Sequence, residues 1–298
     1  MIDWQSIEQQ LAVSTASPVQ LAAPTPISGG DIHSAYRVVD QHSGLEYFVK
    51  INQAPAYPIL QAEHQSLLAI QAANKITSPQ PLFCGVNQSN SFLVMEYLAL
   101  SSEGDDYRLG QQLAQLHRYT VQQTARPYGF EHDNFIGLTP QTNIWAARWV
   151  DFWIEQRIKP QYLLAYRHGF KQALQLEEAR LLQAIHSQLH HHNPPAVLLH
   201  GDLWGGNKGF VAQQPAIFDP ACYYGDRETD LAMTELFGGF SSEFYRGYYA
   251  LWPIDPGYRQ RKSIYSLYHV LNHLNLFGSA YLRQSQQLIH TICAECDQ

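Results

Sequence analysis

The sequence predicts an α+β fold of two lobes, in which a small antiparallel sheet with one main helix precedes a larger, mostly helical lobe. Two observations support this prediction. Short alternating segments separated by glycine turns occupy residues 20–51, and an apolar run follows at residues 91–98. Beyond residue 100, long segments carry apolar residues at helical spacing. Hairpins followed by helices argue against a doubly wound parallel sheet.

The first part of the chain supplies the elements of the sheet lobe. Residues 3–12 have the pattern of a short helix, and apolar residues at helical spacing after Pro58 predict the main helix of this lobe. An apolar, Pro-flanked segment lies around residues 82–84. Alternating or apolar segments predict strands at residues 19–27, 34–39, 45–51 and 91–98.

The second part of the chain is mostly helical. Helical periodicity covers about residues 106–122, 142–167, 170–190 and 228–295. Short β segments are expected at residues 197–199, 208–211 and 216–218. We therefore divide the chain into an N-lobe of residues 1–98 and a C-lobe of residues 99–298.

Composition limits the classes of function. The 298 residues include 19 Lys plus Arg and 26 Asp plus Glu, so the formal net charge of −7 does not suit a nucleic-acid backbone. No segment reaches the roughly 18 apolar residues of a membrane span, and the N-terminus lacks the pattern of a signal peptide. Four cysteines do not make a disulfide framework. We expect a cytoplasmic protein that binds neither nucleic acid nor membrane, of unknown oligomeric state.

The strongest chemical signal is HGDLWGGN at residues 200–207. Asp202, followed five residues later by Asn207 in a loop between short strands, matches the phosphotransfer pattern H-x-D-x-x-x-x-N. In this pattern the aspartate reaches the substrate hydroxyl and takes its proton, while the asparagine binds a metal ion on the phosphates. Asp219 ends an apolar strand twelve residues later and is expected to be the second Mg²⁺ ligand.

Features of the N-lobe complete this set. Gly29 and Gly30 lie in a turn between two predicted strands, where backbone N–H groups are placed to cover phosphates. Lys50 ends the third strand as a phosphate-binding lysine would, and Glu63 lies in the next helix, where it is expected to pair with Lys50. The apolar strand closes at the lobe boundary with three residues whose backbone groups are expected to bind adenine: Met95, Glu96 and Tyr97.

Each feature alone has an ordinary structural explanation, such as a hairpin turn, a surface lysine or a turn at Asp219-Pro220. Together, in this order on the predicted lobes, they predict a kinase-like fold that binds ATP and Mg²⁺. No GxxxxGK[ST] segment is present, so the chain is not a P-loop kinase. Two other patterns favour structural roles: Cys293 and Cys296 as free thiols in a helix, and His190-His191-His192 as part of a solvated turn.

Longer segments resemble the fructosamine kinase family of ketosamine-3-kinases. They are HGDLWGGN, IFDPACYYGDRETDLAM at residues 217–233, and ISGGDIHSAYRV, FVKI and FLVMEYL upstream. The resemblance runs from residue 27 to the C-terminal helices and implies the aminoglycoside-phosphotransferase and protein-kinase-like fold. It also implies ATP-dependent phosphorylation of the 3-hydroxyl of fructosamine, ribulosamine or erythrulosamine adducts on small amines or protein lysines. Because the 3-phosphate makes the adduct unstable, the implied role is deglycation.

The resemblance also implies roles for single residues. Trp204 is typical of this family, and we expect its ring to pack against the sugar, although a structural wedge in the loop would explain it equally well. Asp230 is expected to brace the catalytic loop rather than to touch the substrate. The remaining implied roles repeat those of the motif: Asp202 as proton acceptor, Asn207 and Asp219 as Mg²⁺ ligands, Lys50 and Glu63 as the phosphate-binding pair, and Met95 to Tyr97 as the adenine hinge.

Two alternatives stay open. One is a phosphotransferase of the same fold with another acceptor, such as an aminoglycoside or choline. The other is a non-catalytic nucleotide-binding scaffold. The family-typical Trp204 and the segment Asp219-Pro220-Ala221-Cys222 argue against the first, and the complete set of catalytic residues argues against the second.

Overall fold

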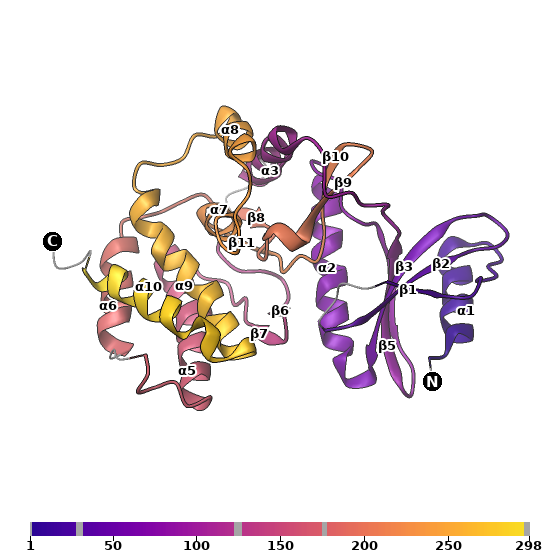
Figure 1. The fold of residues 1–298 in the computed structure, drawn as a ribbon, viewed down its shortest axis with the longest axis horizontal. Helices are drawn as coiled ribbons and strands as arrows, with labels where there is room; N and C mark the ends of the chain where they lie inside the picture. Colours follow the sequence, from indigo (N-terminus) through magenta and orange to yellow (C-terminus); the bar gives the residue numbers. More distant parts are fainter. Residues whose placement is uncertain (1, 28–31, 122–126, 175–177, 295–298) are drawn as a thin grey trace.

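The computed structural model describes residues 2–27, 32–121, 127–174 and 178–294. It contains a sheet-bearing N-terminal lobe and a mostly helical C-terminal lobe, which lie on the right and left of Figure 1. The predicted α+β fold is therefore confirmed. The last strand of the first lobe ends at Glu96 and the first helix of the second begins at Asp106, so residue 98 remains our proposed division.

The N-lobe is built on one antiparallel sheet with the strand order β1-β2-β3-β5-β4. The predicted strand 34–39 is confirmed, whereas the first strand is shorter than expected. Pro24 and Pro26 lack an N–H donor, and Leu21 makes only an isolated bridge to Asp40. The strands are β1 Thr25–Ile27, β2 Ser34–Val39, β3 Glu46–Gln53, β4 Pro81–Val86 and β5 Asn90–Glu96.

Two helices cover opposite faces of this sheet (Figure 1). Helix α1 (Trp4–Thr15) packs on the face that contains Val49, and helix α2 (Tyr57–Ala73) packs on the other. Side chains alternate between the faces of a strand, so Lys50 on β3 faces α2 although its neighbours in the sequence face α1. This alternation directs the lysine toward Glu63.

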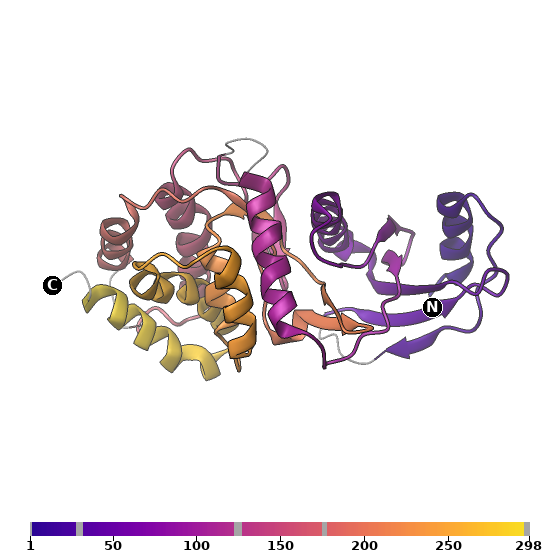
Figure 2. The same ribbon diagram turned by 90° about the horizontal axis from the view of Figure 1, so that it is seen from above.

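The C-lobe surrounds an aromatic core. Figure 2 shows α3 lying along the boundary between the lobes, with the other helices of the C-lobe on its side away from the N-lobe. The described elements of this lobe include a π-helical turn, η2, between α4 and α5. The helices are α3 Asp106–Val121, α4 Trp149–Trp153, η2 Ile154–Ile158, α5 Lys159–Arg167, α6 Glu178–Leu189, α7 Glu228–Thr234, α8 Ser242–Leu251, α9 Tyr258–Phe277 and α10 Leu282–Ala294. None of the described helices combines the length and apolar character needed to cross a bilayer.

Three short hairpins or strand pairs complete the C-lobe, and two of them frame the loops of the predicted site. The strand pairs are β6 Asn134–Ile136 with β7 Thr139–Gln141, β8 Val197–Leu199 with β11 Tyr223–Gly225, and β9 Lys208–Val211 with β10 Gln214–Ile217. The β6–β7 hairpin was not predicted, and the helix expected from residue 142 begins only at Trp149. Buried amide side chains hold this region, as in the bond from Gln141 to Asn134, and such bonds leave no apolar periodicity in a sequence.

Helices α3 and α8 touch backbone to backbone. A Cβ atom added to Gly110 would lie 2.0 Å from the carbonyl oxygen of Phe244, and one added to Gly247 would lie 1.9 Å from that of Tyr107. Only glycine fits at such a crossing, so these two positions set the distance between the helices.

We therefore expect Gly247→Ala to lower the free energy of unfolding by about 1–3 kcal/mol, because the methyl group would force the two helices apart. Urea unfolding followed by circular dichroism measures this change. Gly205→Ala is the matched control, since a Cβ atom there would meet open space. Equal stability of the two variants would contradict the argument.

Candidate active site

A cavity of about 720 Å³ opens between the lobes and is lined by residues of both. Its N-lobe walls include Phe48 and Met95, which are apolar, and Lys50. Its floor includes Asp202 and Asp219. The cavity thus has an apolar portion beside a group of charges, and these charges come from distant parts of the chain.

Lys50 lies between two carboxylates. Its Nζ atom donates to both oxygens of Glu63, at 2.8 and 2.9 Å, and to Oδ1 of Asp219 at 2.7 Å. The lysine and glutamate side chains are nearly buried, whereas Asp219 is 45% exposed toward the cavity. The predicted pairing of Lys50 with Glu63 is present, and Asp219 adds a contact across 169 residues of sequence.

These contacts determine the ionisation states of Lys50 and Glu63. Burial alone would lower the pKa of Lys50, but Asp219 and Glu63 outweigh burial and raise it. Burial raises the pKa of Glu63 in turn, against the effect of Lys50. We take Glu63 as ionised because Lys50 donates to both of its oxygens, which a protonated carboxyl group would not accept equally.

The loop between β8 and β9 is held from below by Asp230. The Asp230 carboxylate accepts the N–H groups of His200 at 2.8 Å and of Gly201 at 2.9 Å, and it also contacts Nε2 of His117 at 3.2 Å. Asp230 is only 1% exposed. It therefore braces the loop, as expected, and does not reach the cavity.

Backbone geometry brings this loop against the segment that carries Asp219. Gly201 has φ +82°, and a Cβ atom there would lie 2.1 Å from the carbonyl oxygen of Ala221. Asp219 itself has φ 58°, a left-handed conformation that costs energy for a residue other than glycine. The N–H of Ala221 donates to the His200 carbonyl at 2.8 Å. These constraints place Asp202 and Asp219 on the same cavity.

Asp202 is half-buried among negative charges. Burial, together with the carboxylates of Asp219 and Asp230, raises its pKa to about 7. Nδ2 of Asn207 donates to the Asp202 carbonyl at 2.8 Å and lies 3.4 Å from Oδ2. Asp202 can therefore take up a proton near neutral pH, which is the property of a general base.

The donor set beside Asp202 fits a magnesium ion. Because Asn207 uses its amide nitrogen on Asp202, its amide oxygen is left for a ligand. Lys50 binds only Oδ1 of Asp219 among the described contacts, which leaves Oδ2 on the cavity side. Amide and carboxylate oxygens are the hard donors that Mg²⁺ prefers.

Some backbone groups of the predicted adenine hinge already form hydrogen bonds within the protein. Met95 is buried in the apolar wall, and Glu96 and Tyr97 also line the cavity. However, the N–H of Tyr97 donates to the carbonyl of Glu46 at 3.2 Å and is used there. Gly29 and Gly30 lie outside the described residues.

Sequence reasoning missed the far end of the cavity. This part is lined by the β6–β7 hairpin and the C-terminal end of α9. The predicted Trp204 also lines the cavity and is 40% exposed, with its ring over Gly206. A leucine- and tyrosine-rich helix gives no sign of which face lines a cavity. The unpredicted lining residues of the hairpin and of α9 are Asn134, Phe135, Ile136, Gly137, Leu138, Asn272, His273, Leu276 and Phe277.

His33 was also missed. Burial and the charge of Lys50 lower its pKa to about 4, so the ring is neutral at pH 7. Nδ2 of Asn52 lies 2.9 Å from Nδ1 of His33, and since the amide nitrogen can only donate, the proton of His33 is on Nε2. His33 lines the cavity as an uncharged donor.

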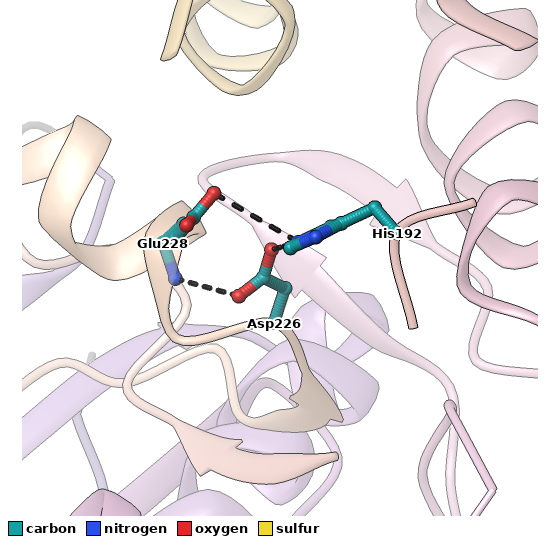
Figure 3. Close-up of side chains that lie close together, drawn as sticks. All are labelled: His192, Asp226 and Glu228. Atoms are coloured by element: carbon teal, nitrogen blue, oxygen red, sulfur yellow. Dashed lines mark hydrogen bonds and ion pairs between the residues drawn. The ribbon is translucent and has the colours of Figure 1, made fainter. Parts of the chain in front are cut away.

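A second cluster lies outside the cavity, and Figure 3 shows the ring of His192 directed at Asp226 with Glu228 beside them. His192 Nε2 lies 2.7 Å from Oδ2 of Asp226, which also accepts the hydroxyl of Tyr265 at 2.7 Å. Arg261 donates to both oxygens of Glu228. The ligand atoms are already used, so we interpret the cluster as structural. The solvated turn expected at residues 190–192 is wrong for His192, whose side chain is 16% exposed.

The comparisons with known proteins agree along the whole chain. A family model described as fructosamine kinase matches residues 3–295. A protein of Synechocystis sp. named a probable ketoamine kinase is 42% identical over 289 residues, which cover 96% of this chain and 95% of that protein.

Solved structures show the same fold. A Haemophilus somnus protein assigned as a fructosamine-3-kinase has a TM-score of 0.89 and 31% identity, with 97% of each chain covered. The GDP complex of an aminoglycoside 2′-phosphotransferase has a TM-score of 0.57 and 14% identity, with 97% of each chain covered. At 14% identity the likeness concerns the fold alone, and it confirms the predicted aminoglycoside-phosphotransferase and protein-kinase-like architecture.

The raised pKa of Asp202 predicts a dependence of stability on pH. The folded value of about 7 lies above the ordinary 3.8, so ionisation costs folding free energy that is fully felt above pH 7. Because water reaches part of this side chain, we expect Asp202→Asn to raise the free energy of unfolding by about 1–2 kcal/mol at pH 8 and by less than half of that at pH 5.

Urea unfolding at the two pH values, without nucleotide or divalent ions, measures this gain. The exposed residue Glu103, changed to Gln, is the matched control. A gain that is absent at pH 8, or larger at pH 5, would contradict the raised pKa.

Proposed function

Because the chain belongs to the fructosamine kinase family, we propose that it transfers the terminal phosphoryl group of ATP to the 3-hydroxyl of a ketosamine. The observation that carries this proposal is the cavity between the lobes, whose lining brings Asp202 together with the predicted phosphate, metal and sugar contacts: Lys50, Asn207, Asp219 and Trp204. The acceptors would be fructosamine, ribulosamine or erythrulosamine adducts of small amines or protein lysines. The 3-phosphate would make the adduct unstable and so release the free amine, and the cellular role would be deglycation.

The N-lobe would bind the nucleotide. Lys50, held by Glu63, supplies the positive charge for the phosphates. The apolar side chains of Phe48 and Met95 supply walls for the adenine ring. Backbone groups of Glu96 and Tyr97 would bind its edge, although the N–H groups of both already donate to the carbonyls of Gln80 and Glu46. Gly29 and Gly30 keep their proposed role over the phosphates.

Asn207 and Asp219 would hold Mg²⁺ through the amide oxygen and the free carboxylate oxygen described above. When bound, the ion neutralises charge on the phosphates and supports their in-line geometry. Lys50 already compensates the other oxygen of Asp219, so the chain presents this carboxylate in a fixed orientation.

Asp202 would orient the acceptor hydroxyl and accept its proton. A carboxylate with a pKa of about 7 is a stronger base than an ordinary aspartate and still ionises at cellular pH. The hydrogen bond from Asn207 and the brace from Asp230 hold it in place. The exposed ring of Trp204 offers a flat apolar face against which we propose that the sugar packs.

A substrate panel tests the reaction. We expect phosphorylation of ribulose-lysine or fructose-lysine, with the new phosphate on the 3-oxygen by mass spectrometry of the product. Kanamycin and choline represent the alternative acceptors of the same fold. Phosphorylation of either in preference to the ketosamines would overturn the proposal, and no phosphorylation of any acceptor would favour a non-catalytic scaffold.

Replacement of Asp202 tests the mechanism. We expect Asp202→Ala to lower kcat by about 10²–10⁴-fold, the usual contribution of general-base catalysis. The affinity for ATP should stay within about threefold, because the phosphate contacts come from other residues. Calorimetric titration with the Mg²⁺ complex of ATP measures the affinity, and Glu103→Gln is again the control. Near wild-type turnover in Asp202→Ala would refute the assignment.

A further inference from the structure

Arg157 is a fully buried cation to which the proposed reaction gives no role. It lies in the π-helical turn Ile154–Ile158, and it is 0% exposed. Among the described residues no carboxylate forms an ion pair with it. A buried charge without a counter-ion is unfavourable unless other groups replace the water it has lost. π-Helical turns are themselves uncommon and often occur at functional sites.

Carbonyl oxygens and aromatic rings replace that water. The guanidinium carbon lies 4.1 Å from the ring centre of Tyr223 and 4.6 Å from that of Phe152, so the cation contacts both of these stacked rings. Its nitrogens donate to the carbonyl of Thr142 and to Oδ1 of Asn143, both at 2.7 Å. Arg157 is therefore attached to the chain that leaves the β6–β7 hairpin.

Asn143 connects Arg157 to the β6–β7 hairpin. Its Nδ2 atom donates to the carbonyl of His132 and to Oδ1 of Asn134, both at 3.0 Å. Nδ2 of Asn134 then donates to the carbonyl of Cys222 at 2.7 Å, three residues after Asp219. Asn143 and Asn134 are both buried, and Asn134 also lines the cavity.

Arg157 and the backbone carbonyls of His132 and Cys222 set the same direction for these hydrogen bonds. A guanidinium group has five N–H donors and no acceptor, so the oxygen of Asn143 must face it and the nitrogen must face Asn134. The same rule at the next step turns the nitrogen of Asn134 toward Cys222. A neutral side chain at position 157 would leave Oδ1 of Asn143 and the carbonyl of Thr142 without these donors, while the carbonyl of His132 would still hold Nδ2 of Asn143.

We propose that Arg157 is a positioning residue for the acceptor end of the cavity, where it holds the β6–β7 hairpin against the segment after Asp219. This inference rests on the proposed function and assigns the ketosamine to the part of the cavity that this hairpin lines. The phosphate end has its own supports, namely the ion pair of Lys50 with Asp219 and the bond from Ala221 to His200. Loss of Arg157 therefore weakens acceptor binding and leaves nucleotide binding nearly unchanged.

Arg157→Met tests this separation. The change removes the charge and the donors at similar length, and we expect the KM for the ketosamine to rise about tenfold or more, as small misplacements in a site do. The KM for ATP should stay within about twofold, because the nucleotide contacts are not in this network. Arg148→Met is the matched control, since Arg148 is an exposed arginine nearby that pairs with Asp151.

Arg157→Lys gives the conservative variant. Lysine keeps a donor-only cation but lacks the planar fork, so we expect the KM for the ketosamine to return to within about threefold of the wild type. A structural role of side-chain bulk alone would not distinguish Met from Lys in this way. Equal effects of the two variants, or equal rises in both KM values, would overturn the proposal.

Asn143→Asp keeps the test decisive if Arg157→Met fails to fold. The aspartate satisfies Arg157 with a carboxylate, but it cannot donate to Asn134, so the network is broken one step further on. We expect the same rise in the KM for the ketosamine, with Asn193→Asp as an exposed control of equal charge.

Hydrogen exchange of the free protein provides a readout that needs no substrate. In Asn143→Asp, amides of residues 133–143 and 219–223 should exchange faster than in the wild type, while those of β3 and β5 should not. If the wild type phosphorylates no ketosamine, the proposed function fails, and this measurement still decides on the network. Unchanged exchange in both segments would overturn the role of Arg157.

Discussion

The ammonium group of Lys50 between Glu63 and Asp219 is the interaction on which the site depends. These two partners lie 13 and 169 residues away in the sequence. One ammonium group therefore connects strand β3, helix α2 and a loop of the C-lobe. The contact requires the two-residue alternation of β3, because only that alternation turns Lys50 toward α2 while its neighbours enter the opposite core. Nearly full burial then strengthens the attraction that holds the three groups together.

On the C-lobe side, the loop between β8 and β9 is held mainly through its backbone rather than through its side chains. Asp230 binds consecutive N–H groups, and Gly201 lets the chain pass within contact of Ala221. Asp202 can therefore be held among like charges that would otherwise push it into solvent. The strain at Asp219 and the raised pKa of Asp202 are both costs of this placement, and costs of that kind are typical of sites shaped by chemistry.

The sequence predicted the parts of this molecule that follow periodic patterns. Strand β2 and the pairing of Lys50 with Glu63 were both expected, since alternation and motif spacing leave a direct trace in the residues. The hairpin that bears Asn134 was not, because the amide side chains that hold it bond to one another and to the distant carbonyl of Cys222, and such bonds follow no period in the sequence. The same holds for the part of the cavity lined by α9, a helix that is buried on most sides and carries both polar and apolar residues there.

The Asp230 carboxylate determines how the protein is expected to unfold in acid. Burial alone would raise its pKa, but the hydrogen bond and charge of His117, with the other donors around it, lower that pKa. Its stabilising effect is thus present at neutral pH and is lost as the pH falls through the lowered value. One proton would then release His200, Gly201 and His117 together, so acid should open the loop as a cooperative unit before the aromatic core of the C-lobe unfolds.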